Sequence, residues 1–168
     1  LQWIQASLPV RNGGLGVRRV SSLAPSAFLA SAAGTRDLQA LILSKCQCPT
    51  DAHITSVMSM WTSRLGCTSS AVRDSSKQHS WDQPCVDADI TALKLALTDN
   101  RDKARFLAVA APHSGDWLNA LPISTCGLRL DNETIRIAVG LRLGCKLCES
   151  HQCPCGVKVD TLGSHGLS

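Results

Sequence analysis

Apolar residues recur at intervals of three or four along most of the chain, and short polar or glycine-containing stretches separate these runs. Residues at that spacing share one face of an α-helix, so the pattern predicts a series of amphipathic helices. The predicted helices cover residues 21–33, 35–45, 51–66, 86–98, 100–111 and 131–143. The apolar residues are mainly Ala, Leu and Val, with no Tyr and only two Phe, which favours packed helices over sheet. We therefore expect a mostly α fold that ends in a short irregular Cys/His segment.

The predicted helices carry their own start signals and apolar faces. Thr35, Asp51 and Asp131 stand where N-capping side chains stand, and Gly66 is placed to end the third helix. Pro25 fits the first turn of the first helix, where its missing N–H costs little. The side chains expected to point inward are Val20, Leu23, Ala24, Ala27 and Ala30; Leu38, Leu41 and Ile42; Ile90, Leu93, Leu95 and Leu97; Phe106, Leu107 and Val109; Trp117, Leu118 and Leu121; and Ile135, Ala138, Val139 and Leu143.

Residues 67–83 form a Ser-rich polar stretch that interrupts the helical pattern, and its composition predicts a linker or a mobile loop.

Near the start of the chain, Pro9 and the sequence Asn12-Gly13-Gly14 predict a tight turn. This turn lacks the Lys and the following Ser or Thr that a phosphate-binding P-loop requires. The expected organisation is a basic helical segment (1–66), a linker (67–83), a second helical segment (84–144) and a Cys/His segment (145–168).

Charge is spread unevenly over a chain whose net charge is +4. Residues 1–80 carry eight basic and three acidic side chains, which fits contact with nucleic-acid phosphates and fits an ordinary solvated surface as well. No apolar stretch reaches the roughly 18 residues that a membrane span needs, and the first residues lack the basic start and apolar run of a signal peptide. We expect an intracellular protein, in the nucleus or the cytoplasm, without a membrane partner.

The nine cysteines are an odd number, and without a secretory signal they point to metal binding rather than to a disulfide framework. The C-terminal cluster contains six candidate ligands, which are Cys145, Cys148, His151, Cys153, Cys155 and His165. Thiolate and imidazole are the groups that bind zinc in tetrahedral sites. Buried thiols without metal, and redox chemistry at the Cys-x-x-Cys pair, are the weaker alternatives. Zinc is thus the expected cofactor.

Within this cluster, Cys153 and Cys155 are spaced so that both sulfurs can bind one ion. Pro154 stiffens the pair, and Gly156 gives the backbone the freedom to turn around a metal. Glycines on both sides of His165 let the chain return toward the pair. The residues alone leave open which of the remaining candidates completes the site.

Four pieces of the chain, taken in order, resemble one family. The segment "QASLPVRNGGLGVRRVSSLAPSAFLASA" (5–32) resembles the stretch after the polymerase core of non-LTR (LINE-type) retrotransposon reverse transcriptases. The segments "DWLNALP" (116–122) and "GLRLDNETIRIAVGLRLG" (127–144) resemble the helical region that follows it. The last segment, "HQCPCGVKVDTLGSHGLS" (151–168), resembles the Cys/His zinc motif that precedes a C-terminal endonuclease domain. Residues 46–100 carry no part of the resemblance.

The resemblance implies a specific ligand set. Its zinc ligands in this chain are Cys153, Cys155 and His165, and the family's fourth ligand is a Cys a few residues after the His. That position lies just beyond Ser168, so we expect the chain to be an excerpt of a longer polyprotein. Otherwise Cys148, Cys145 or His151 must take the place of the fourth ligand.

The resemblance also implies a function. Residues 1–66 would be thumb-like, and their cations would follow the template–primer backbone; the expected contacts are Arg11, Arg18, Arg19 and Arg36. The zinc segment would grip RNA or target DNA and join the polymerase to a downstream endonuclease, so the partners are nucleic acid and the rest of the polyprotein. Polymerase chemistry requires paired Asp residues that hold two Mg²⁺ ions, and this chain has no Asp-Asp pair, so we expect it to be non-catalytic. The alternative is a zinc-stabilised helical module, from a decayed or domesticated element, with a structural or protein-interaction role and no nucleic-acid binding.

Overall fold

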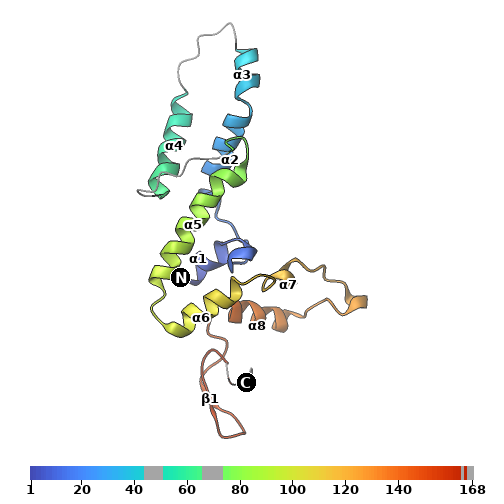
Figure 1. The fold of residues 1–168 in the computed structure, drawn as a ribbon. Helices are drawn as coiled ribbons and strands as arrows, with labels where there is room; N and C mark the ends of the chain where they lie inside the picture. The colour runs from blue at the N-terminus through green and yellow to red at the C-terminus, as the bar shows by residue number, and fades with distance from the viewer. Residues whose placement is uncertain (44–50, 66–73, 164, 166–168) are drawn as a thin grey trace. The chain divides into compact units, whose positions relative to one another are not determined.

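A computed structural model of the chain describes residues 1–43, 51–65, 74–163 and 165, and the fold is mostly α as predicted. The α-helices are α1 (Gln2–Ser7), α2 (Val20–Gly34), α3 (Arg36–Ile42), α4 (Ala52–Leu65), α5 (Gln78–Ala96), α6 (Asn100–Val109), α7 (Asp116–Asn119) and α8 (Asn132–Leu143) (Figure 1). Two 3₁₀ turns, η1 (Val10–Asn12) and η2 (Ser124–Cys126), and two short strands, β1 (His151–Gln152) and β2 (Lys158–Val159), complete the described elements.

The chain forms two compact units. Unit 1 consists of Leu1–Val17 together with Leu93–Ser168, and unit 2 consists of Arg18–Ala92. Helix α5 contributes its first part to unit 2 and its last turn to unit 1. These units differ from the four consecutive segments expected from composition, because the first 17 residues belong with the C-terminal half of the chain.

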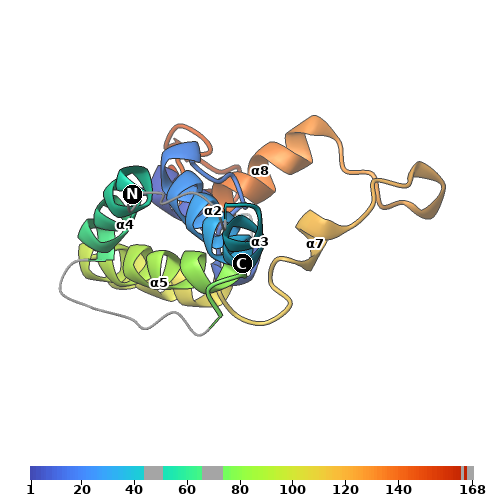
Figure 2. The same ribbon diagram turned by 90° about the horizontal axis from the view of Figure 1, so that it is seen from above.

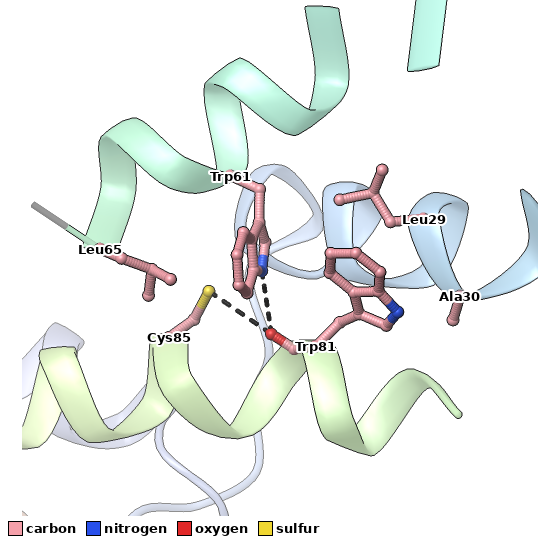
Figure 3. Packing of buried hydrophobic residues seen from close by; sticks show 6 residues of the cluster. All are labelled: Leu29, Ala30, Trp61, Leu65, Trp81 and Cys85. Carbon is pink, nitrogen blue, oxygen red and sulfur yellow. Dashed lines mark hydrogen bonds between the residues drawn. The ribbon is translucent and has the colours of Figure 1, made fainter. Parts of the chain in front are cut away.

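Unit 2 is built around two tryptophans that lie on different helices. Trp61 of α4 and Trp81 of α5 pack edge to face, with ring centroids 5.1 Å apart and an interplanar angle of 76°. The indole N–H of Trp61 donates to the backbone carbonyl of Trp81 at 2.9 Å. The rest of the core comes from α2, α4 and α5, as Figure 3 shows; these residues are Leu29, Ala30, Leu65 and Cys85. Burial in this core raises the pKa of the Cys85 thiol.

The linker expected over residues 67–83 is wrong in its second part. Residues 78–83 belong to α5, and Trp81 is only 6% exposed. Ahead of the helix, the Asp74 carboxylate accepts the backbone N–H of Ser76 at 3.1 Å, and the Trp81 indole donates to the Ser75 carbonyl at 2.8 Å. A single large aromatic side chain therefore fixes a stretch whose composition is that of a loop. Residues 67–73 of the expected linker lie outside the described residues.

The start and the buried face of α2 differ from those predicted. The helix begins at Val20, so Pro25 lies inside it rather than in its first turn. The buried residues are Ser26, Leu29 and Ala30, while Val20 is 81% exposed. Of the residues expected to face inward, only Ala30 is buried. The face of α2 that packs against α4 and α5 is therefore not the face on which the smallest side chains lie.

For α3 neither the predicted cap nor the predicted buried face is found, whereas the predicted cap of α4 is confirmed. The expected stripe of α3, formed by Leu38, Leu41 and Ile42, is exposed, because a helical repeat shows which face can be buried but not whether a partner covers it. The Thr35 hydroxyl donates back to the Ser31 carbonyl at 2.8 Å instead of capping α3. Asp51 does cap α4, since its carboxylate accepts the N–H of His53 at 2.9 Å. The expected end of α4 at residue 66 and of α3 at residues 44–45 lie outside the described ranges.

Unit 1 is held together by a buried polar network between the two ends of the chain. Arg142 of α8 is 4% exposed, and its guanidinium donates to the carbonyls of Gly14 (3.0 Å), Ser114 (3.1 Å) and Val10 (2.8 Å). This burial lowers the pKa of Arg142. In return, the carbonyl of Arg142 accepts bonds from the Gln5 side chain at 3.0 Å and from Arg105 at 2.6 Å.

The turn predicted from Asn12-Gly13-Gly14 is confirmed, and the packing around the Arg142 network explains why residue 14 is a glycine. Gly13 has φ +86° at the end of η1. A Cβ at Gly14 would lie 2.0 Å from the carbonyl oxygen of Leu8, so no larger residue fits there. The close approach lets the Gly14 carbonyl meet the Arg142 guanidinium.

The segment between α7 and α8 extends away from the helices of unit 1, as both views show (Figures 1 and 2). Its apolar side chains are exposed, and these are Leu121, Ile123, Leu128 and Leu130. The expectation that Leu121 points inward is therefore wrong, and Ile135, Leu95 and Leu107 are also exposed against prediction. Leu93, Leu97, Phe106 and Leu143 are buried as predicted. Within the described ranges, none of the helices has the length and hydrophobicity that crossing a bilayer requires.

Candidate metal centre

A β-hairpin carries the first two candidate ligands. Strands β1 and β2 pair antiparallel, with His151 opposite Val159 and Gln152 opposite Lys158. The five residues between the strands form the tip, which begins at Cys153. There the N–H of Cys153 donates to the Val157 carbonyl at 2.9 Å, and the N–H of Gly156 donates to the Cys153 carbonyl at 2.8 Å. The tip is therefore a closed turn that displays Cys153 and Cys155 side by side.

Gly156 is the residue that permits this turn. Its φ is +87°, in the left-handed region that L side chains rarely adopt, and nothing lies within 4 Å of a Cβ built there. The requirement at this position is thus conformational and not steric. A Gly directly after a Cys-Pro-Cys sequence was the sequence signal for it.

His165 completes a group of three metal-binding side chains. The ligand atoms of Cys153, Cys155 and His165 all lie within 4.8 Å of one another. The Cys155 Sγ and His165 Nε2 atoms are 3.0 Å apart, at hydrogen-bond distance. Donor atoms on a tetrahedral ion at ordinary Zn–S and Zn–N distances are separated by roughly 3.3–3.8 Å, so the Cys155 and His165 atoms would move apart by a few tenths of an ångström to share an ion. The group can therefore hold a metal ion.

The chemistry of Cys155 fits the role of a ligand. The backbone N–H of Val157 and then the Cys153 thiol form hydrogen bonds to its sulfur, and these hold the pKa of Cys155 below its usual value. The thiolate is the form of cysteine that binds metals. Cys155 is exposed, while Cys153 and His165 are partly buried, so the group lies where an ion can enter from solvent.

Two of the predicted ligands lie apart from this group. The Cys148 thiol donates to the backbone carbonyl of Asp160 at 3.3 Å, which places it at the base of the hairpin rather than at the tip. The His151 ring nitrogen Nδ1 is 2.9 Å from the Glu149 carbonyl, and neither residue joins the three-ligand group among the described residues. Cys148 precedes β1 and His151 begins it, so their role as ligands stays a prediction that the described three-residue group does not include.

The four arginines predicted to contact nucleic acid lie in both units. Arg11 in η1 and Arg36 at the start of α3 are exposed. Arg18 forms a two-point pair with Asp82, in which Nη1 is 2.9 Å from Oδ2, and both side chains are largely buried. The Nε atom of Arg19 is buried, and no described atom accepts its hydrogen. Arg18 thus has a structural role that its sequence context did not reveal.

Comparisons of this chain with protein-family models, with curated proteins and with solved structures give no match.

Sequence reasoning missed the residues that support the candidate site. Asp160, directly after β2, accepts a hydrogen bond from Arg101 of α6 at 2.7 Å. Leu147 and Cys148 both donate their backbone N–H groups to the Thr161 carbonyl, and the Ser150 hydroxyl donates to the Val159 carbonyl. These bonds join the stem of the hairpin to the segment that returns toward His165. An Asp before a Thr-Leu-Gly turn was the available signal, but its partner Arg101 lies 59 residues away.

Proposed function

We propose that this chain is a non-catalytic, nucleic-acid-binding segment of a non-LTR retrotransposon reverse transcriptase polyprotein. In this proposal Cys153, Cys155 and His165 bind zinc, and the segment joins the polymerase to a downstream endonuclease inside the cell. The observation that carries the proposal is the convergence of two thiols and an imidazole at the tip of the hairpin. Three protein ligands leave one coordination position for water or a further side chain.

Zinc would supply structure here rather than chemistry. A bound ion would fix the return of the chain from β2 to His165, and the binding free energy would add to the stability of the hairpin. Its two positive charges would also offset the two thiolates, so that the tip could approach a phosphate backbone.

The charges of unit 1 support contact with nucleic acid. Its two segments carry ten basic and seven acidic side chains. Several of the cations are exposed, and these are Arg11, Lys94, Lys103, Arg129, Lys146 and Lys158. Lys158 lies on β2 of the hairpin itself, so metal binding and phosphate contact would share one element.

The metal can be tested by titration with Co²⁺, which replaces zinc and gives a thiolate charge-transfer absorption. We expect the wild-type chain to show this absorption and to lose it on addition of excess zinc. The variants Cys153→Ser and Cys155→Ser should lose intensity, because each removes one thiolate. Cys126→Ser is the matched control, since Cys126 is a free, exposed cysteine outside the group. Equal loss of intensity in the control would contradict the assignment.

Nucleic-acid binding can be tested with the zinc-loaded chain. We expect affinity for single-stranded RNA, an RNA–DNA hybrid or duplex DNA to fall steeply between about 50 and 200 mM salt, because phosphate contacts release counterions. Arg36→Gln should weaken binding, while Arg136→Gln should not, since Arg136 already pairs with Glu133 on α8. Absence of binding to all three probes at low salt would refute this part of the proposal.

A second candidate function is a zinc-stabilised structural or protein-interaction module. The observation that favours it is the large share of arginines engaged within the chain. Five of them pair with carboxylates, and these are Arg18, Arg64, Arg101, Arg105 and Arg136. This module would bind Co²⁺ as above, lose stability when the metal is removed, and show no salt-dependent affinity for any of the nucleic-acid probes.

A further inference from the structure

Asp160 forms hydrogen bonds to the base of the hairpin, to helix α6 and to the segment that leads from β2 to His165, which we call the return segment. Its carboxylate oxygen Oδ1 accepts the backbone N–H of Leu162 at 3.1 Å, and Oδ2 accepts Arg101 Nη1 at 2.7 Å. Its backbone carbonyl accepts the N–H of Gly163 at 3.1 Å and the thiol of Cys148 at 3.3 Å. Asp160 thus connects the turn to the base of the hairpin and to α6.

We propose that Asp160 positions His165 for metal binding, an inference that rests on the proposed metal site. His165 is the one ligand outside the hairpin tip, and the chain reaches it through the turn at residues 160–163. The Asp160 carboxylate closes this turn by accepting the Leu162 N–H, two residues later. Without that bond the segment has more conformations to lose before His165 can meet the two thiols.

The Arg101 pair gives the turn a fixed direction. Arg101 lies on α6, whose Phe106 is buried in unit 1, so the guanidinium reaches Asp160 from a packed helix. The side chains of the pair are 52% and 44% exposed, so the pair contributes little to global stability. Its effect is to orient the return segment, in the way that residues behind metal ligands orient those ligands in other sites.

This inference also gives Cys148 a role. Its thiol donates to the Asp160 carbonyl, so Cys148 supports the same turn instead of binding the ion. Gly163, with φ +67°, is the last residue of this turn and bends the chain there. Along the chain, Cys153 and Cys155 come first, strand β2 follows, and the turn at residues 160–163 then leads to His165.

The test is Co²⁺ affinity of the full chain with Asp160→Ala and Asp160→Asn, compared with Glu149→Ala. Removing any nearby carboxylate weakens cation binding somewhat, and Glu149→Ala measures that electrostatic part because Glu149 is exposed near the same stem. We expect Asp160→Ala to weaken Co²⁺ binding about 10- to 100-fold, as loss of such supporting residues does elsewhere. Asp160→Asn should recover part of the affinity, because its amide oxygen can still accept the Leu162 N–H while its NH2 group cannot accept the Arg101 hydrogen bond. Absorption spectra at saturating Co²⁺ should match the wild type.

Two results would overturn the inference. One is Co²⁺ affinity of Asp160→Ala within about threefold of Glu149→Ala, and the other is Asp160→Asn binding as weakly as Asp160→Ala. Failure of the wild-type chain to bind Co²⁺ would instead refute the proposed metal site itself. Far-UV circular dichroism of the metal-free proteins distinguishes misfolding from a loss of positioning. Because the Arg101–Asp160 pair is exposed, the wild type and the three variants should have equal helicity.

Discussion

Replacing Arg142 should unfold unit 1 selectively, because this residue joins segments from opposite ends of the chain. In Arg142→Met the side chain keeps an unbranched apolar stem but loses the guanidinium and its three charge-assisted hydrogen bonds, to Gly14, Ser114 and Val10. Each such bond contributes about 1.5–3 kcal/mol, and relief of guanidinium burial returns part of the sum. The carbonyls remain in place with no donor, so we expect a net loss of about 3–5 kcal/mol.

Hydrogen exchange measured by mass spectrometry can localise this loss. Peptides covering residues 9–17 and 112–118 contain the three carbonyl partners, and their amides should exchange more than about 100-fold faster in the variant. Peptides from the tryptophan core of unit 2 should change much less. Urea denaturation followed by circular dichroism gives the matching free energy of unfolding.

Arg136→Met is the matched control, because it removes the same side chain from the same helix. Arg136 is exposed, and its ion pair is with Glu133 one turn away, so its removal should leave the exchange of both peptides unchanged. Arg142→Lys should lose less stability than Arg142→Met, since it keeps the charge but not the fork of donors. A stability loss below about 1 kcal/mol in Arg142→Met would refute the reasoning, because it would mean that water replaces the guanidinium at no cost.

Three other changes test the remaining parts of the fold and the site. Trp81→Ala should destabilise unit 2 by about 3–5 kcal/mol through loss of core packing, measured by urea denaturation, whereas Trp3→Ala, at a residue 61% exposed, should have little effect. The N–H of Thr134 holds the pKa of Asp131 below its usual value, so the stabilising contribution of this cap is present above the usual pKa and is lost as pH falls through the lower, folded-state pKa. Helicity measured by circular dichroism should therefore fall less at acid pH in Asp131→Asn than in the wild type. An equal fall in both proteins would argue against this cap. Removal of metal with a chelator should raise hydrogen exchange in residues 147–163 but leave unit 2 unchanged, and uniform exchange before and after chelation would count against metal-coupled order in the hairpin.

Local chemistry accounts for the parts of the fold that the sequence predicted well. Asp131 begins α8 as predicted, since its carboxylate accepts the Thr134 N–H at 2.7 Å, and Gly144, with φ +68°, ends the helix one residue after the predicted last residue. Both signals act within one helical turn, so no knowledge of tertiary contacts was needed. The pair of cysteines around Pro154 was recognisable for the same reason, because its geometry depends on the adjacent Gly156.

Long-range contacts explain where prediction failed. The Gln5 side chain bonds to the Arg142 carbonyl across 137 residues, and nothing near either residue indicates the other. Trp81 stands in a polar, Ser-rich stretch whose composition suggested a loop, yet its burial against Trp61 fixes a helix. The residues alone also left six candidate ligands open, because only the fold brings the Cys153, Cys155 and His165 ligand atoms together and leaves Cys148 and His151 outside the group.

The bond between Gln5 and Arg142 has a consequence for the order of events during synthesis. Unit 1 cannot close until the ribosome has made α8, whereas all of unit 2 is present much earlier. Unit 2 is thus an inserted body that can form first and hold the ends of its own 75 residues, from Arg18 to Ala92, at a fixed separation. Folding of the insert shortens the effective loop that unit 1 must close, and so lowers the entropic barrier to joining the first and last helices. A chain with a destabilised tryptophan core should accordingly assemble its outer unit more slowly, even though no residue of that unit has been changed.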